Sequence, residues 1–256
     1  MDYDGTIAPL GVPRNESRVF KKVEAELERA VKQIPVCIVT AKDFDFVYPR
    51  SRFATGWACV SGLDVRVADG RRSTAKRLRK LDRALRLAES CERKGTYTEL
   101  KRGPSGELLA VAVDWSTVPE LGPSIIRDLR RLTRSGFAVV HERLATFADI
   151  YAALPDKGRA AKHLCRLLQV ESRMMFIGDS ALDNSAFQEA GVSVGVAHGQ
   201  PMAELKCEFV VDQARLAGFL RSLTDHRMEF DPSLPGVRKN REMKVHESRR
   251  EQPPIS

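Results

Sequence analysis

The N-terminal segment Asp2-Tyr3-Asp4-Gly5-Thr6 carries two carboxylates that are separated by a single residue. In an extended backbone, side chains at positions i and i+2 point to the same side, so Asp2 and Asp4 can converge on one ligand. Gly5 gives the chain the freedom to turn immediately afterwards. The pattern alone is equally compatible with a solvated acidic turn, so the rest of the chain must supply partners for it.

A second pair of carboxylates follows an apolar run farther along the chain. The run 174–177 predicts a buried strand, Gly178-Asp179 follows it directly, and Asp183 lies four residues beyond Asp179 on the first turn of a predicted helix. Ligand groups at the carboxyl ends of parallel strands meet in one crevice, so these carboxylates can join Asp2. Carboxylate oxygens there suit a hard cation that also binds phosphate, most simply Mg²⁺.

Two further residues offer contacts to an anion. Thr40 ends the predicted strand 36–39 and provides a hydroxyl and a backbone N–H, while Lys157 follows Pro155-Asp156 at the start of a predicted helix. The dipole at such a helix start favours anions. In isolation Thr40 reads as a helix cap and Lys157 as a surface cation. Their placement together with the acidic segments favours an anion site.

The elements that must position these residues alternate between helix and strand, as in an α/β protein with a parallel sheet. Asn15 or Ser17 is expected to cap a helix that ends before Pro35. Further strands are predicted at 57–60, 192–196 and 208–211, and further helices at 158–169, 183–190 and 213–223. This order predicts a doubly wound, Rossmann-like parallel core sheet with the acidic residues at its carboxyl end.

The middle of the chain has a different pattern. A basic helix is expected to begin near Asp69-Gly70, and the following elements are predicted as strands 96–102 and 107–114, a helix at 120–135, and strands 137–141 and 148–153. The order α-β-β-α-β-β indicates an inserted α+β cap domain with an antiparallel sheet. We therefore predict a discontinuous core domain at 1–66 and 155–224, a cap domain at 67–154, and a flexible polar tail at 225–256.

Composition narrows the class of protein. The chain has 256 residues, of which 43% are hydrophobic, enough to fill a core and to exclude wholesale disorder. No apolar run approaches the ~20 residues that span a bilayer, and the first residues lack a signal peptide's basic and apolar regions, so we expect a cytoplasmic protein without a membrane partner. The net charge of +8 suits nucleic acid, an anionic membrane surface or a small phosphorylated substrate equally well.

The ordered set of motifs resembles the haloacid dehalogenase superfamily of phosphotransferases. The motifs are D-Y-D-G-T at 2–6, Thr40 after an apolar strand, Lys157 before a helix, and G-D-S-A-L-D at 178–183. The insertion between Thr40 and Lys157 resembles the larger cap type of this superfamily. The run D-Y-D-G-T-I-A-P at 2–9 is similar to that of trehalose-6-phosphate phosphatases in particular.

The resemblance implies a role for each matching residue. Asp2 would attack phosphorus to form an aspartyl-phosphate, and Asp4 would protonate the leaving alcohol and later deprotonate water. Asp2, the backbone carbonyl of Asp4 and Asp179 would hold Mg²⁺, with Asp183 orienting its water shell. The phosphoryl oxygens would be bound by Thr40 and Lys157.

Two features depart from the family pattern. Only Met1 precedes Asp2, where the family has a central hydrophobic strand, so we expect the natural polypeptide to start several apolar residues upstream. In the cap, Glu99 and Lys101 resemble the acidic and basic pair of sugar-reading caps, but apolar residues stand where the next strand should carry His-x-Arg. Further cap candidates are His141, Glu142 and Arg143, which are equally compatible with exposed polar positions.

Three functions follow from the sequence as hypotheses. The first is a Mg²⁺-dependent phosphatase of a small sugar phosphate, with trehalose 6-phosphate as one candidate. The second is a phosphatase of another small metabolite, such as a sugar acid phosphate or phosphoglycolate. The third is a nucleic-acid-binding protein, because positive charge clusters between Arg71 and Arg86; that segment has no aromatic residues for stacking bases, which makes this function the least favoured. The oligomeric state stays open.

Overall fold

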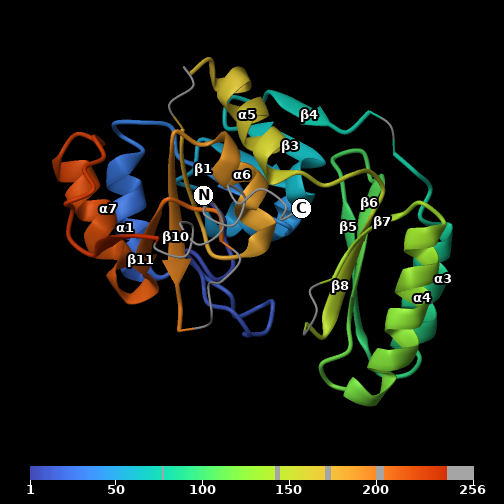
Figure 1. The fold of residues 1–256 in the computed structure, drawn as a ribbon. Helices are drawn as coiled ribbons and strands as arrows, with labels where there is room; N and C mark the ends of the chain where they lie inside the picture. Colours follow the sequence, from blue (N-terminus) through green and yellow to red (C-terminus); the bar gives the residue numbers. More distant parts are fainter. Residues whose placement is uncertain (77, 142–144, 171–173, 200–204, 241–256) are drawn as a thin grey trace, which may run out of the picture.

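The computed structural model describes residues 1–256 except 77, 142–144, 171–173, 200–204 and 241–256. Three four-stranded sheets organise the described residues. Two of them form the core layer, and the third belongs to the inserted unit at the right of Figure 1.

The first core sheet contains β1 (Cys37–Val39), β2 (Gly56–Cys59), β3 (Asp64–Val67) and β4 (Arg72–Thr74), in that order. The β1–β2 pair is parallel, whereas β3 and β4 are antiparallel to their neighbours. The second core sheet has the order β12 (Val237–Lys239), β11 (Phe209–Asp212), β10 (Val192–Ala197), β9 (Met175–Gly178). In it, β9, β10 and β11 are parallel, and β12 is antiparallel to β11.

Met1 and Asp2 lie between these two sheets and join them. The Met1 carbonyl accepts a hydrogen bond from the Val39 N–H in β1 at 2.8 Å, and the Asp2 N–H donates to the Ile177 carbonyl in β9 at 2.8 Å. The backbone ladder therefore runs from β1 through residues 1–2, which we call the seam strand, into β9. The seam strand brings the motif at 2–6 beside the carboxyl end of β9.

Helices cover both faces of the core layer (Figure 1). The pair α1 (Lys21–Ala30) and α7 (Leu216–Asp225) packs on one face, where Val23, Leu27 and Ala30 of α1 are buried at helical spacing. On the other face lie α5 (Lys157–Leu168) and α6 (Asn184–Glu189). This confirms the predicted doubly wound α/β core. The α1 helix begins later than expected, so neither Asn15 nor Ser17 caps it.

The inserted unit contains α3 (Asp82–Glu92), β5 (Tyr97–Arg102), β6 (Leu108–Asp114), α4 (Gly122–Arg134), β7 (Ala138–Val140) and β8 (Phe147–Tyr151). This is the expected α-β-β-α-β-β order, and the antiparallel sheet has the order β5-β6-β8-β7. Both helices pack on one face of the sheet through a hydrophobic cluster of their own. We propose that this unit forms the cap domain, with boundaries near residues 66 and 155.

Two expectations about segment boundaries were wrong. The basic helix expected from Asp69-Gly70 starts only at Asp82, because the turn at Gly70 leads into β4, which pairs with β3. The tail expected from residue 225 is ordered through residue 240: β12 pairs with β11, Leu234 is buried, and the Phe230 ring lies 4.8 Å from that of Phe209. Residues 241–256 of the expected tail lie outside the described residues.

Candidate active site

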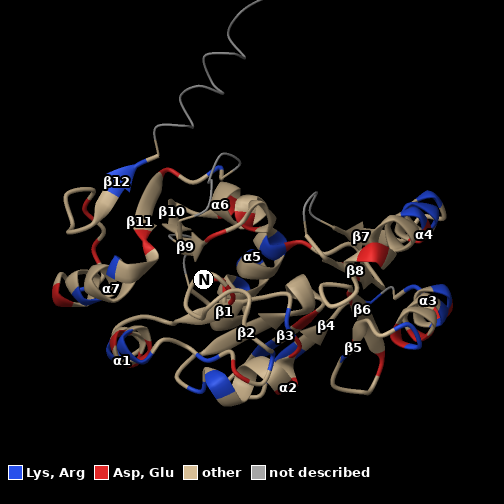
Figure 2. Ribbon diagram, turned by 90° about the horizontal axis from the view of Figure 1, so that it is seen from below, with Lys and Arg blue, Asp and Glu red and all other residues tan. Residues whose placement is uncertain are grey.

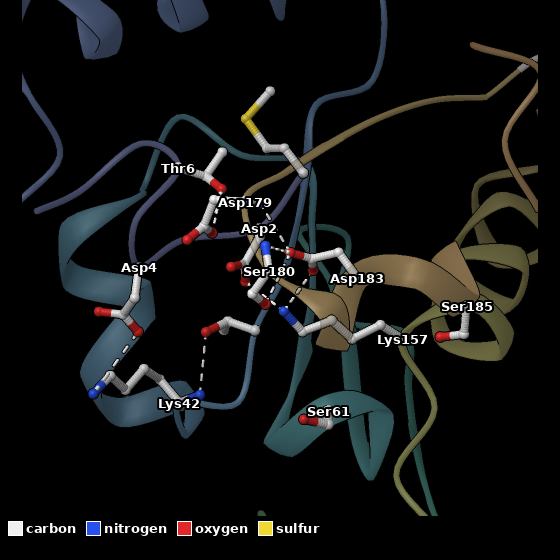
Figure 3. Close-up of polar contacts among 12 residues, drawn as sticks. Asp2, Asp4, Thr6, Lys42, Ser61, Lys157, Asp179, Ser180, Asp183 and Ser185 are labelled. Atoms are coloured by element: carbon white, nitrogen blue, oxygen red, sulfur yellow. Dashed lines mark hydrogen bonds and ion pairs between the residues drawn. The ribbon is translucent and has the colours of Figure 1, made fainter. Parts of the chain in front are cut away.

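Three carboxylates meet where the seam strand and β9 end (Figure 3). One oxygen each from Asp2, Asp179 and Asp183 lies within 4.8 Å of the others, and the Asp2 and Asp183 side chains are buried. Asp179 directly follows β9, and Asp183 ends a short 3-10 turn (Ala181–Asp183) before α6. The structure thus brings together the two acidic segments that are far apart in the sequence.

Local hydrogen bonds hold two of these carboxylates in place. The Asp183 Oδ2 atom accepts the backbone N–H groups of Asp179 and Ser180, each at 3.1 Å. Asp179 Oδ1 accepts the Thr6 hydroxyl at 2.9 Å, and its Oδ2 lies 3.1 Å from His198 Nε2. These contacts fix the carboxylates before any ligand binds, which lowers the ordering cost of binding.

Gly5 lets the N-terminal segment approach Asp179 closely. Its φ is +73°, and a Cβ atom at this position would lie 2.0 Å from Asp179 Oδ2. Both the backbone conformation and the close approach therefore require glycine.

We expect Gly5→Ala to destabilise the chain by about 3 kcal/mol or more, because it adds a steric clash to the strain of a left-handed backbone. Gly11→Ala is the matched control, since Gly11 has a φ of +70° but a Cβ atom there would meet no other atom within 4 Å. It should cost only about 1–2 kcal/mol. Urea unfolding compares the two variants, and equal losses would contradict the close approach.

Lys157 is the cation at the centre of the cluster. It is the first residue of α5, which Asp156 caps by accepting the Arg159 N–H at 3.0 Å. Its Nζ donates to Asp2 Oδ1 at 2.8 Å and to Asp183 Oδ1 at 2.7 Å, and the side chain is buried. The ammonium thus faces a pair of carboxylates, and its binding of a phosphoryl group stays a prediction.

The charges of the cluster are not balanced by Lys157 alone. Burial raises the pKa of Asp2 to about 6, although the Lys157 ammonium opposes this shift. Burial and the neighbouring Asp183 carboxylate likewise raise the pKa of Asp179 to about 6. Burial on its own lowers the pKa of Lys157, but the ion pairs with Asp183 and Asp2 outweigh it and raise that pKa. One ammonium among three carboxylates leaves excess negative charge, so the site suits a further cation.

The metal-free chain should lose stability as pH rises from about 4 to about 6. In this range the native state keeps protons on Asp2 and Asp179 that the unfolded chain releases at the ordinary pKa of 3.8, so unfolding is favoured by rising pH. Urea unfolding with a chelator across this range measures the slope, and Asp2→Asn should make it shallower. Added Mg²⁺ should restore stability near pH 7 by binding the ionised carboxylates. If stability changed with pH by the same slope in the parent and in Asp2→Asn, the Asp2 carboxylate would not contribute to this pH dependence.

The remaining predicted core residues, Thr40 and Asp4, lie on the loops next to the cluster. Thr40 is buried after β1, and its Oγ1 accepts the Lys42 N–H at 3.1 Å. The Asp4 carboxylate is partly exposed, stands outside the group of three carboxylates, and has an oxygen 3.8 Å from Lys42 Nζ. Figure 3 shows Asp4 and Lys42 on the opposite side of Asp2 from Asp183. Asp4 thus lies beside the carboxylate cluster but not in it.

The predicted cap residues fall into two groups. The register of β5, β6 and β8 places Glu99 and Lys101 on the sheet face opposite α3 and α4, together with Asp149. Glu99 forms an ion pair with Arg14 from the core, and the Lys101 Nζ donates to Asp149 Oδ1 at 2.6 Å in a buried pair. His141 instead lies beside Trp115, a residue of the cluster under the helices. Glu142 and Arg143 lie outside the described residues.

Ser61 links the inserted unit to the loops around Thr40 and Lys157. Its N–H donates to the Thr40 carbonyl at 2.8 Å, and its carbonyl accepts the Asp156 N–H at 3.0 Å. Its hydroxyl lies 3.1 Å from the Tyr151 hydroxyl, which donates to Asp149 Oδ2 at 3.2 Å. Ser61 has a left-handed backbone with a φ of 52°, a strained conformation held by these contacts.

We expect Tyr151→Phe and Ser61→Ala to be coupled energetically. Each removes one hydroxyl of the pair, so the free energies of unfolding in a double-mutant cycle should show a coupling of about 0.5–1.5 kcal/mol. Tyr97→Phe is the control on the same sheet, because Tyr97 is 54% exposed. Strict additivity of the first pair would show that the hydroxyl contact is not formed.

Several site residues were not singled out by the sequence. Thr6 belongs to the D-x-D-G-T motif, so its contact with Asp179 could have been anticipated. Ser61, Tyr151, Asp149 and His198 carry no motif, because their partners come from other parts of the chain and only folding reveals them.

Comparisons with known proteins identify the fold. The sequence model of the haloacid dehalogenase-like hydrolases matches residues 124–223. Among curated proteins, none matches the sequence significantly. The fold is similar to that of a trehalose-6-phosphate phosphatase related protein, with a TM-score of 0.59 and 18% identity over 88% of this chain and 96% of that one.

Two further solved structures are similar. The C-terminal domain of trehalose-6-phosphate phosphatase from C. albicans has a TM-score of 0.67 and 13% identity over 88% of this chain and 90% of that one. A subclass IIB sugar phosphatase of the haloacid dehalogenase superfamily has a TM-score of 0.61 and 14% identity over 89% of this chain and 98% of that one. The chain therefore has the haloacid dehalogenase-like hydrolase fold, which confirms the resemblance seen in the four motifs.

Proposed function

We propose that this protein is a Mg²⁺-dependent phosphomonoester hydrolase that acts on a small sugar phosphate through an aspartyl-phosphate. The observation that carries the proposal is the group of three carboxylates around Lys157 at the carboxyl ends of the seam strand and β9. Phosphoryl transfer accounts for the burial of an ammonium together with two acidic segments that are far apart in the sequence.

In this proposal the reaction proceeds in two displacements, in which Asp2 and Asp4 take part. An Asp2 carboxylate oxygen attacks phosphorus, the P–O bond to the sugar breaks, and Asp4 gives its proton to the leaving alcohol oxygen. In the second displacement Asp4 takes a proton from water, the water oxygen attacks the phosphorus, and the bond to Asp2 breaks. Inorganic phosphate leaves, and both carboxylates return to their starting states.

Lys157 and Thr40 have supporting roles in this proposal. The Lys157 ammonium holds the Asp2 carboxylate at 2.8 Å. Its positive charge would stabilise the negative charge on the phosphoryl oxygens in the transition state. Thr40 would donate its hydroxyl to one of those oxygens, while Asp183 anchors Lys157 and the turn at Asp179 and Ser180.

The donor set fits a small, hard divalent cation. Asp2 and Asp179 supply carboxylate oxygens, the backbone carbonyl of Asp4 would add a third, and excess negative charge remains after Lys157 is counted. When bound, Mg²⁺ would neutralise the phosphate and the attacking carboxylate so that they can approach each other. Asp183 would hold water around the ion.

The cap face supports a small polar substrate. Glu99, Lys101, Asp149 and Tyr151 place charged and hydroxyl groups on the sheet face opposite the cap helices, and the Ser61–Tyr151 contact brings this face to the core. Such groups suit the hydroxyls of a sugar. Trehalose 6-phosphate is one candidate, and a sugar acid phosphate or phosphoglycolate is the alternative.

Release of inorganic phosphate from a panel of phosphorylated metabolites tests the proposal. With Mg²⁺ we expect hydrolysis of at least one sugar phosphate, and a chelator should abolish it. Nucleic-acid binding with a steep salt dependence and no hydrolysis of any panel member would instead support the basic nucleic-acid-binding function.

Among the described residues no helix is long and apolar enough to cross a membrane.

A further inference from the structure

A pocket whose lining residues are different from those of the carboxylate cluster lies on the first core sheet. It has a volume of about 450 Å³, within the range of small-molecule sites. Its walls come from α2 (Phe44–Val47), the 3-10 turn at Tyr48–Arg50, and strands β2, β3 and β4. None of its lining residues is an acidic member of the candidate active site.

Four arginines line this pocket. Arg66 on β3 pairs directly with Trp57 on β2 and with Arg72 on β4, so the three side chains share one sheet face in a row. Arg52 and Arg71 join them from the neighbouring loops. Like charges directly opposite each other on adjacent strands repel, and within the Arg66–Arg72 pair Asp64 neutralises only Arg66.

Only part of this charge is neutralised by the protein. Asp64 accepts the Arg66 guanidinium at 2.8 Å, and Asp69 accepts that of Arg71 at 2.5 Å. Over the part of the chain that the structure describes, Arg52 and Arg72 have no carboxylate within ion-pair distance, so these two guanidinium groups of the pocket lack a counterion there. Figure 2 shows blue segments on β3 and beside α2.

Aromatic rings form the other wall of the pocket. Phe44 and Tyr48 stack with centroids 4.9 Å apart, and both meet the buried Trp57 ring edge to face at 5.6 and 5.2 Å. The Arg66 guanidinium lies 3.9 Å above the Phe44 ring, and that of Arg52 lies 5.8 Å from the Tyr48 ring. A flat ring can contact Tyr48, which is 39% exposed, while an attached anion reaches the arginines.

We propose that this pocket binds a small anion that carries a planar ring, the chemistry of a nucleoside monophosphate. The unneutralised Arg52 and Arg72 would bind the anionic group, and the aromatic wall would contact the ring. The inference rests on the pocket alone and does not depend on the proposed phosphatase activity.

Calorimetric titration of the full chain with AMP tests this binding site. The titration uses the Asp2→Asn protein with a chelator, so that AMP is not hydrolysed at the carboxylate cluster. We expect saturable binding of AMP. Adenosine lacks the anionic group and inorganic phosphate lacks the ring, so each should bind more weakly than AMP by about tenfold or more.

Matched variants locate the site. Arg52→Ala with Arg72→Ala should weaken AMP binding by about tenfold or more, whereas Arg86→Ala with Arg130→Ala, which removes two arginines of the cap helices, should leave it unchanged. Without AMP, Arg72→Ala should not lower the thermal midpoint, because Arg72 is exposed and forms no ion pair with the described residues. This second readout shows that any loss of binding does not come from unfolding.

Several results would overturn the proposal. These are no saturable AMP binding, an equal loss in the two double variants, or inorganic phosphate binding as tightly as AMP. A single-stranded oligonucleotide that binds at the same arginines and is not displaced by AMP would also overturn it, because the occupant would then be a nucleic acid.

Discussion

Asp2→Asn should abolish phosphate release while leaving the fold intact. The amide is not a nucleophile toward phosphorus, so we expect a loss of roughly 10⁴-fold or more in kcat. The variant should be at least as stable as the parent without metal near pH 7, because it removes one carboxylate whose burial raises its pKa to about 6.

Phosphate release and urea unfolding on the same preparation measure both expectations. Asp82→Asn serves as the control, because Asp82 is an exposed residue at the start of α3, a helix of the inserted unit and not of the core domain that holds the cluster. It should retain full activity. Normal turnover by Asp2→Asn would remove Asp2 from the mechanism.

Lys157→Met should cost both activity and stability. The Nζ atom bridges Asp2 at 2.8 Å and Asp183 at 2.7 Å, so its loss leaves two buried carboxylates facing each other without a cation. We expect kcat/KM to fall by roughly 10³-fold and the free energy of unfolding to fall by about 3–5 kcal/mol near pH 8. The stability loss should shrink near pH 5, where the carboxylates gain protons.

Lys162→Met is the matched control on the same helix. Lys162 forms an ion pair with Glu189, but its side chain is 56% exposed, so its removal should change stability by less than about 1 kcal/mol. It should not alter kcat/KM. If both variants lose the same stability, or if the loss in Lys157→Met does not vary with pH, the bridging role of Lys157 is wrong.

The sequence predicted the parts of the site that depend on strand ends. Residue types at a strand end and the alternation of elements are local properties, so Asp179 and Lys157 were placed correctly relative to their elements. The edges of the sheets were harder to predict. The strands β4 (Arg72-Ser73-Thr74) and β12 (Val237-Arg238-Lys239) are short and polar, and only their pairing partners make them strands.

Contacts between residues far apart in the sequence could not be predicted from it either. The alternation of β5 predicts that Glu99 and Lys101 share a face, but nothing local indicates that Arg14 and Asp149 neutralise them. The seam strand at Met1 and Asp2 is a further example, because a two-residue segment carries no strand signal. Partners in such contacts are set by the packing of the whole fold.

Transfer of a phosphoryl group to Asp2 is the central claim, and mass spectrometry of a rapidly quenched reaction tests it most directly. The full chain is mixed with Mg²⁺ and a sugar phosphate that the panel identifies as a substrate, quenched in acid during the first turnover, and digested. We expect one phosphoryl group on the peptide that contains Asp2, and none in Asp2→Asn. A phosphoryl group on another residue, or complete turnover with Asp2 never modified, would contradict it.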